Sequence, residues 1–249
     1  MQKTQQENDK IQFSDNNLCY SKYDDFPILD THSEMQLWSL KDEEISFSGK
    51  RQNFCICFID MMNSTKISTE LTDTGISKYY TIFLNAMATI AKNHGAKIVK
   101  NAGDCLIYYF PNTSESSNLL AFKDVIECGI TMILAHRAIN AKLHEERLPS
   151  LDYRISADYG IVQVARSRSL QGDDLFGSTV NVCAKINSKA SANGMVIGNN
   201  LYQITKAFDN YAYKEVEGYG IGSYQKYSVY SITSKNKRTM LNPFKRTVE

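Results

Sequence analysis

NFCICFID, residues 53–60, is a short apolar run of strand length that ends in an acid. Such a run predicts a central strand of a sheet, with Asp60 at its end. Farther along, GISKYYTIFLNAMATIAKNHG (75–95) has apolar residues at three- and four-residue intervals and Gly95 as a natural stop. This spacing predicts a packed helix after the strand.

The rest of the chain continues to alternate between strands and helices. AKIVKNAGDCLIYYF (96–110) predicts two strands joined tightly around 101–103, and a long helix is expected over about 118–147. The further elements are two strands around Gly160, a helix after a loop that starts at Asp173, a strand at 195–198, a short helix at 199–208 and two strands around a glycine-rich loop at 218–222. This order predicts an α/β fold, an α+β sandwich with a mainly antiparallel sheet flanked by helices.

Composition and charge exclude several classes of protein. Lys and Arg number 28 against 27 acids, so the formal charge of +1 gives no field that would draw the chain to nucleic acid or anionic lipid. The six cysteines form no C-x-x-C pair and no zinc spacing, and most lie in apolar runs, as expected in a reducing compartment. The chain has no apolar N-terminal segment and no run of 18 apolar residues, so we expect a cytoplasmic protein without a membrane span.

The pattern predicts one domain with two extensions. Residues 1–50 are expected to form a polar N-terminal arm, partly disordered because its first part is rich in Gln, Asn and Asp. Residues 51–233 are expected to form the folded domain. Residues 234–249 are expected to form a basic C-terminal tail.

Two acids lie where a sheet presents functional groups. Asp60 ends an apolar strand, and Asp104 begins another just past a turn. If the strands are neighbours, the two carboxylates could share one or two Mg²⁺ ions, because hard cations prefer oxygen ligands. MMNSTK (61–66) follows Asp60 and offers backbone N–H groups that could hold a phosphate. Taken singly, Asp60 is explained as a cap or a strand-end acid, and Asp104 as part of a Gly-Asp turn.

A second cluster of polar residues lies in DDLFGSTVNVCAKIN, residues 173–187. Asn181 and Lys185 are four residues apart, so on a helix they share one face, just after the acid Asp174. Taken singly, Lys185 is a solvent-facing helical lysine, and Lys100 is a strand-end residue. The four histidines have no partner at a telling spacing and are interpreted as structural or surface residues.

Together these segments resemble the catalytic domain of the class III nucleotidyl cyclases. FIDMMNST is similar to the family's first-strand metal motif, KNAGD to its K-x-x-G-D hairpin, and DLFGSTVNVCAK to its D-x-[FW]-G-x-x-V-N-x-A-x-R signature. The resemblance covers about residues 53–232. It implies the ferredoxin-like class III cyclase fold and the conversion of ATP to 3′,5′-cyclic AMP and pyrophosphate.

The resemblance also implies a role for each matching residue. Asp60, Asp104 and the carbonyl of Met61 would bind two Mg²⁺ (or Mn²⁺) ions. Further, Asn63, Ser64 and Thr65 would hold the triphosphate, Lys100 and Asp174 would read adenine, Asn181 would orient the ribose, and Lys185 would neutralise charge on the α-phosphate. The family works as a head-to-tail dimer with shared sites, which implies a homodimer here, although pairing with a related chain stays open.

Two departures from the family pattern favour an alternative function. The family has arginine where this chain has Lys185, and a point charge lacks the fork with which arginine grips two oxygens. In VEGYGIGS (216–223), Glu217 and Tyr219 fall where better-known members often carry a phosphate-binding lysine, and Lys214 or Lys226 could substitute. The alternative is a catalytically weak or inactive cyclase-like domain that binds nucleotide or mediates dimerisation.

Overall fold

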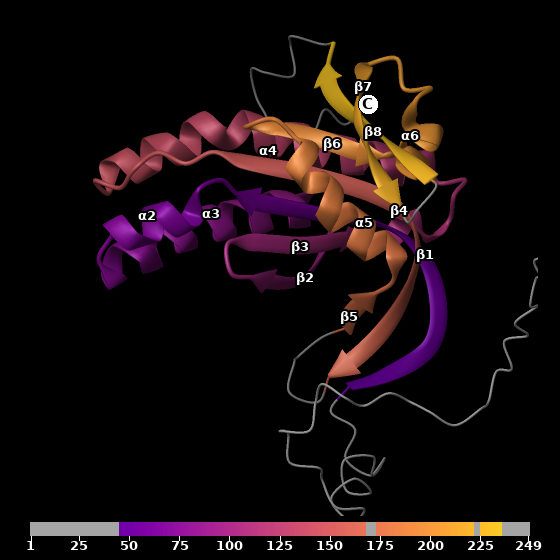
Figure 1. The fold of residues 1–249 in the computed structure, drawn as a ribbon, viewed down its shortest axis with the longest axis horizontal. Helices are drawn as coiled ribbons and strands as arrows, with labels where there is room; N and C mark the ends of the chain where they lie inside the picture. The colour runs from indigo at the N-terminus through magenta and orange to yellow at the C-terminus, as the bar shows by residue number, and fades with distance from the viewer. Residues whose placement is uncertain (1–44, 168–172, 222–224, 236–249) are drawn as a thin grey trace, which may run out of the picture. The chain divides into compact units, whose positions relative to one another are not determined.

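The computed structural model describes residues 45–167, 173–221 and 225–235, and its centre is an eight-stranded sheet (Figure 1). The strand order is β2-β3-β1-β4-β6-β8-β7, and β5 pairs with β4 beside this path. Among the strand pairs of the described residues, only β4–β6 is parallel. The strands are β1 (Ile45–Met61), β2 (Lys97–Ala102), β3 (Cys105–Phe110), β4 (Tyr153–Ser167), β5 (Asp173–Phe176), β6 (Gly194–Gly198), β7 (Tyr211–Ile221) and β8 (Gln225–Ser234).

Helices cover both faces of the sheet. They are α2 (Ser64–Glu70), α3 (Asp73–Asn93), α4 (Leu119–Glu145), α5 (Ser178–Ile186) and α6 (Asn199–Thr205). The predicted mainly antiparallel sheet flanked by helices is therefore confirmed. The helices at 75–95 and 118–147 and the hairpin at 96–110 were also predicted correctly.

The second half of β1, residues 54–61, is buried on both faces except at Asp60, which is why its sequence is apolar without alternation. Cys55, Cys57 and Ile59 belong to the larger core cluster, which includes buried residues of α3 and α4. The alternate residues, Phe54, Ile56 and Phe58, pack in a second cluster with Cys183 of α5. Since neighbours along a strand point to opposite faces, α3 and α4 lie against one face and α5 against the other.

Three predictions about the region around β4 were wrong. Strand β1 begins at Ile45 rather than at residue 53, and β4 is one continuous strand rather than two strands around Gly160. Register partners of β1 run along β4 on both sides of Gly160, so the ladder continues through the glycine. A Cβ at Gly160 would lie 2.6 Å from Thr179 Oγ1, so the glycine serves the close approach of α5. Residues 173–176 are strand β5 rather than a loop.

The first part of β1, the last part of β4 and β5 together extend from the rest of the sheet as an arm (Figure 1). Residues 1–44 of the predicted N-terminal arm (1–50) lie outside the described residues, as do residues 236–249 of the predicted basic tail (234–249). Within the described ranges, no helix combines the length and the apolarity needed to cross a membrane.

Candidate functional site

Asp60 and Asp104 lie next to each other at one end of the sheet. Asp60 is the register partner of Cys105 on β3, and Asp104 immediately precedes Cys105 in the β2–β3 turn. Burial and then the charge of Asp104 raise the pKa of the Asp60 carboxyl. Burial and the same two acids raise the pKa of Cys105 to about 12, so its thiol stays protonated. The strands that carry the two acids are therefore neighbours, and Asp60 and Asp104 lie close together.

Arg154 on β4 is part of this cluster and was missed in the sequence. It is the register partner of Asp60 on the other side of β1, and its Nη2 donates to Asp60 Oδ2 at 3.2 Å. This ion pair partly offsets the rise in the pKa of Asp60. The Nε of Arg154 is buried without a hydrogen-bond partner in the described part of the chain. Arg154 is flanked in the sequence by Asp152 and Asp158, so its own segment does not point to Asp60 as its partner.

The chain turns sharply after Asp60. The β1–β4 ladder ends with the pair Met61 and Tyr153, and the next N–H, that of Met62, donates to Asp152 O at 2.8 Å. Asn63 has a left-handed backbone (φ 58°) and caps α2, which begins at Ser64. Met61 as a whole residue is only 2% exposed. The predicted turn at 63–65 is thus the start of a short helix.

Lys100 and Asp174 form an ion pair. The Nζ of Lys100 on β2 donates to Asp174 Oδ2 on β5 at 2.5 Å, and the two side chains are 43% and 16% exposed. Asp174 Oδ1 also accepts the N–H of Leu175 at 2.8 Å, which fixes the carboxylate. Two residues that are 74 positions apart in the sequence are therefore joined.

Asn181 and Lys185 lie on α5 and are exposed. The helix is fastened to the sheet by its other face, where the thiol of Cys183 donates to Ile56 O at 3.1 Å and Cys183 O accepts from Ser156 Oγ at 2.8 Å. The helix starts after Gly177, whose φ of 140° and close approach to Ile161 O (3.2 Å from a Cβ) favour glycine.

Asp60 and Lys100 share one face of the sheet. Asp60 continues the alternation of Phe54, Ile56 and Phe58, and Lys100 pairs with Ile107, which pairs with Phe58. This is the face that α5 covers, and on β5 it is Leu175, the neighbour of Asp174, that packs in the cluster on this face. The side chains of Glu217, Tyr219 and Lys226 lie outside the described part of the chain, and Lys214 is exposed on β7.

The side chains of the described residues do not enclose a metal ion by themselves. Among them, no group of three or more His, Cys, Asp and Glu side chains is arranged to hold an ion. A divalent cation at Asp60 and Asp104 would therefore complete its shell with backbone, water or substrate oxygens, which suits Mg²⁺.

The family model for the adenylate and guanylate cyclase catalytic domain matches residues 48–234. The chain belongs to this family. The expected relationship to the class III cyclases is thus confirmed, and class III cyclase domains generally use divalent metals. No curated protein matched the sequence.

Solved cyclase structures share the fold. The adenylyl cyclase CyaB from P. aeruginosa has a TM-score of 0.68 at 20% identity, over 76% of this chain and 97% of that one. The guanylyl cyclase Cya2 has a TM-score of 0.66 at 22% identity, over 76% of this chain and 95% of that one. The guanylate cyclase domain of RhGC from Catenaria anguillulae, in complex with GTP, has a TM-score of 0.64 at 18% identity, over 75% and 100%. Both nucleotide specificities occur among these structures.

Proposed function

We propose that the protein is an adenylyl cyclase that converts ATP to 3′,5′-cyclic AMP and pyrophosphate by attack of the ribose 3′-hydroxyl on the α-phosphate. The observation that supports this choice is the Lys100–Asp174 ion pair, in which β2 and β5 hold an ammonium and a carboxylate side by side. A cytoplasmic location remains a prediction.

Asp60, Asp104 and the carbonyl of Met61 are the proposed ligands for two Mg²⁺ or Mn²⁺ ions. The donor set fits, because the charge of Asp104 destabilises the negative charge of Asp60 and a cation between them would remove that repulsion. Two such ions supply a lowered pKa at the attacking hydroxyl and stabilisation of the leaving phosphate. The fold supplies the two carboxylates at fixed places, Asp60 at the end of β1 and Asp104 in the β2–β3 turn.

Arg154 is the proposed cation for the phosphates. Its guanidinium lies 3.2 Å from Asp60 and has a buried Nε with no partner within the described residues. A guanidinium can give two parallel hydrogen bonds to phosphate oxygens. Together with backbone N–H groups at Asn63, Ser64 and Thr65, it would orient the triphosphate.

Lys100 and Asp174 are the proposed readers of the base. Adenine offers an acceptor at N1 and a donor at its exocyclic amine, which match an ammonium and a carboxylate. Guanine carries an acceptor, O6, at the place of that amine, so the carboxylate would face an oxygen. Because the two side chains are already paired at 2.5 Å, their spacing is set before the nucleotide arrives.

Asn181 is proposed to orient the ribose, and Lys185 to neutralise charge on the α-phosphate. Both project from α5 on the side away from its buried contacts. Removing a preorganised transition-state donor costs about 10²- to 10³-fold in turnover. A lysine keeps the charge and loses the fork, so we expect a smaller reduction than that.

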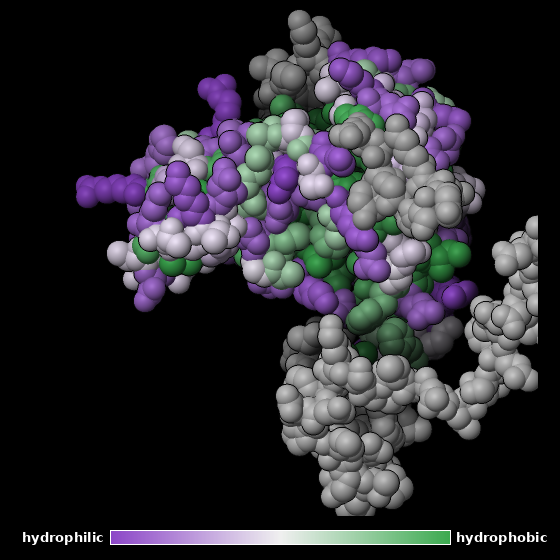
Figure 2. All heavy atoms as spheres, viewed as in Figure 1, coloured by the Kyte–Doolittle hydropathy of each residue, from purple (hydrophilic) through white to green (hydrophobic). Residues whose placement is uncertain are grey.

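The proposed active form is a homodimer in which one protomer supplies Asp60 and Asp104 and its partner supplies the base reader, Asn181 and Lys185. The extension formed by β1, β4 and β5 supports dimerisation, because three of its apolar residues are largely exposed. Ile45, Phe47 and Ile161 are 51%, 54% and 55% exposed. Figure 2 shows apolar side chains gathered in this region. Exposed apolar groups of this size favour burial against another surface.

The alternative is a cyclase-like domain that binds nucleotide without turnover, which Lys185 favours. An assay for cyclic AMP and cyclic GMP, with ATP or GTP and Mg²⁺ or Mn²⁺, distinguishes the two. We expect cyclic AMP from ATP, abolished in Asp60→Ala and Asp104→Ala. Cyclic GMP as the main product would refute the base assignment, and no product at concentrations that give dimers would leave the alternative.

A further inference from the structure

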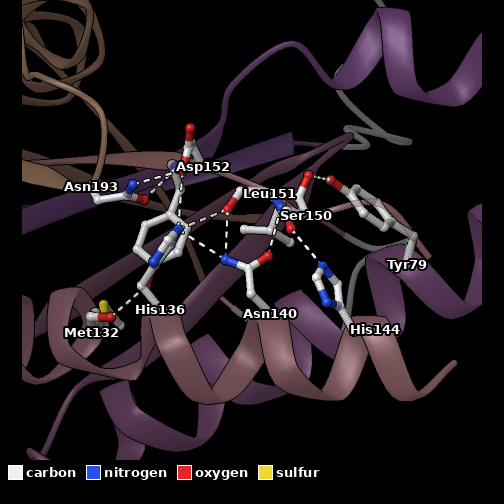
Figure 3. A network of polar contacts seen from close by, with 10 residues as sticks. Tyr79, Met132, His136, Asn140, His144, Ser150, Leu151, Asp152 and Asn193 are labelled. Carbon is white, nitrogen blue, oxygen red and sulfur yellow. Dashed lines mark hydrogen bonds and ion pairs between the residues drawn. The ribbon is translucent and has the colours of Figure 1, made fainter. Parts of the chain in front are cut away.

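A network of polar contacts joins side chains of α4 and Asn193 to the segment that precedes β4 (Figure 3). Its centre is the segment Leu151–Asp152, which leads into β4. The backbone carbonyl of Asp152 accepts the N–H of Met62 at 2.8 Å, one residue beyond the last β1–β4 pair. The position of Asp152 therefore determines where the chain leaves the sheet, two residues after the proposed metal ligand Asp60.

Two side chains of α4 hold this segment. His136 Nε2 lies 3.0 Å from both Leu151 O and Asp152 Oδ1. Both oxygens can only accept, so these two contacts are hydrogen bonds when Nε2 carries the hydrogen; Asn140 Nδ2, a donor 2.9 Å from the same nitrogen, is then a neighbour of Nε2 and not its hydrogen-bond partner. Asn140 brackets Leu151, accepting its N–H at 2.8 Å and donating to its carbonyl at 3.1 Å.

A third side chain that holds the segment comes from outside α4. Asn193 Nδ2 donates to Asp152 Oδ1 at 2.7 Å, and its backbone N–H donates to Tyr153 O at 2.7 Å. Asn193 has a left-handed backbone (φ 54°) just before β6. The carboxylate of Asp152 is thus fixed by donors from two separate elements, α4 and the turn before β6.

We infer that His136, Asn140 and Asn193 are positioning residues for the cyclase site. They act through Asp152 and the N–H of Met62 on the backbone of Met61 and on the start of α2. The inference rests on the proposed function, in which the Met61 carbonyl binds metal and residues 63–65 hold phosphates. No member of the network touches the substrate; its effect is on the placement of groups that do.

The magnitude follows from the geometry of such sites. Displacing a reacting group by about 1 Å can lower turnover by about 10²-fold. Loss of one of the two donors to Asp152 leaves the other in place, so we expect a reduction of about tenfold, mainly in kcat and in the metal concentration needed for half activity.

Two substitutions of His136 separate the hydrogen bond from packing. The ring of His136 lies 5.8 Å from that of Tyr153. His136→Phe keeps a ring there and removes the donor, whereas His136→Gln keeps an N–H donor at a similar reach and removes the ring. His144→Phe is the matched control, because His144 is on the same helix and contacts the same loop only through Ser150 Oγ, at 2.9 Å, in the described interactions.

The experiment measures amide hydrogen exchange at Met62 by NMR, together with kcat against Mg²⁺ or Mn²⁺ concentration. We expect His136→Phe to speed exchange at Met62 about tenfold and to lower kcat by a similar factor. The His136→Gln and His144→Phe variants should stay within about twofold of the wild type. Unchanged exchange and kcat in His136→Phe, or equal losses in the Phe and Gln variants, would overturn the inference.

The two readouts keep the inference separate from the proposed function. If the wild type makes no cyclic nucleotide, the proposed function fails. Exchange at Met62 still decides whether His136 holds this backbone: faster exchange in the Phe variant alone supports the network, and equal exchange in all four proteins refutes it.

Discussion

Replacing Asp158 with asparagine should remove a pH-dependent loss of stability. Asp158 lies on β4, is only 2% exposed, and accepts hydrogen bonds from Tyr227 Oη at 2.7 Å and from its neighbour Tyr159 N at 2.8 Å. A Cβ at Gly198 would lie 2.4 Å from the carboxyl, so the site is closed on that side. Burial raises the pKa of this carboxyl from 3.8 to about 6, although these hydrogen bonds act in the opposite direction.

The sign of the effect follows from the raised pKa. Between pH 3.8 and about 6 the folded protein holds a proton on Asp158 that the unfolded chain releases. The folded state is therefore favoured below this window, and the advantage disappears as the pH rises through about 6. From the difference between the two pKa values, the free energy of unfolding is about 3 kcal/mol lower above pH 7 than in strong acid, where both states are protonated. About 1.4 kcal/mol of this decrease falls between pH 5.0 and 7.5.

The assay is urea unfolding, followed by circular dichroism at pH 5.0 and at pH 7.5. The free energy of unfolding of the wild type minus that of Asp158→Asn should fall by about 1.4 kcal/mol between the two values, since asparagine does not titrate. Asp209→Asn, at an exposed position, controls for the change of residue type. A difference that is the same at both pH values would refute the reasoning about Asp158.

Three further predictions concern the proposed active site. Lys185→Arg should raise turnover up to about tenfold because it restores a bidentate donor; unchanged turnover would remove position 185 from the site. Mixing Asp60→Ala with Asn181→Ala protein should recover about a quarter of wild-type activity, because half of the dimers are mixed and each has one intact site. No recovery, with mixed dimers verified by mass, would contradict shared sites. Lys100→Glu combined with Asp174→Cys should reduce the ratio of ATP to GTP turnover about tenfold or more, and an unaltered ratio would exclude both from base selection.

Much of the fold follows from local patterns in the sequence. The amphipathic spacing of α3 and α4 and the apolar run of β1 are determined by which faces are buried, so they were visible. Gly160 was misleading because a glycine inside a strand pattern signals a turn as readily as a close approach. Only the packed structure shows Thr179 of α5 against it. Strand β5 was missed because its four residues gain their stability from pairing with β4 rather than from their own sequence.

The site was predictable where a motif marks it and not elsewhere. Asp60, Asp104, Lys100 and Asp174 lie in motifs, and the structure joins them in two pairs. The roles assigned to them remain predictions. Arg154 was missed because its partnership with Asp60 depends on strand register, which a sequence read in order does not reveal.

The β2–β3 hairpin carries Lys100 on one strand and Asp104 at its turn. In the proposed dimer these two residues belong to different active sites, one reading a base and the other holding metal. A small tilt of this hairpin, caused by nucleotide entering one site, would then move a group of the second site as well. The two active sites of such a dimer would then be cooperative rather than independent, and the dependence of rate on substrate concentration would depart from a simple hyperbola.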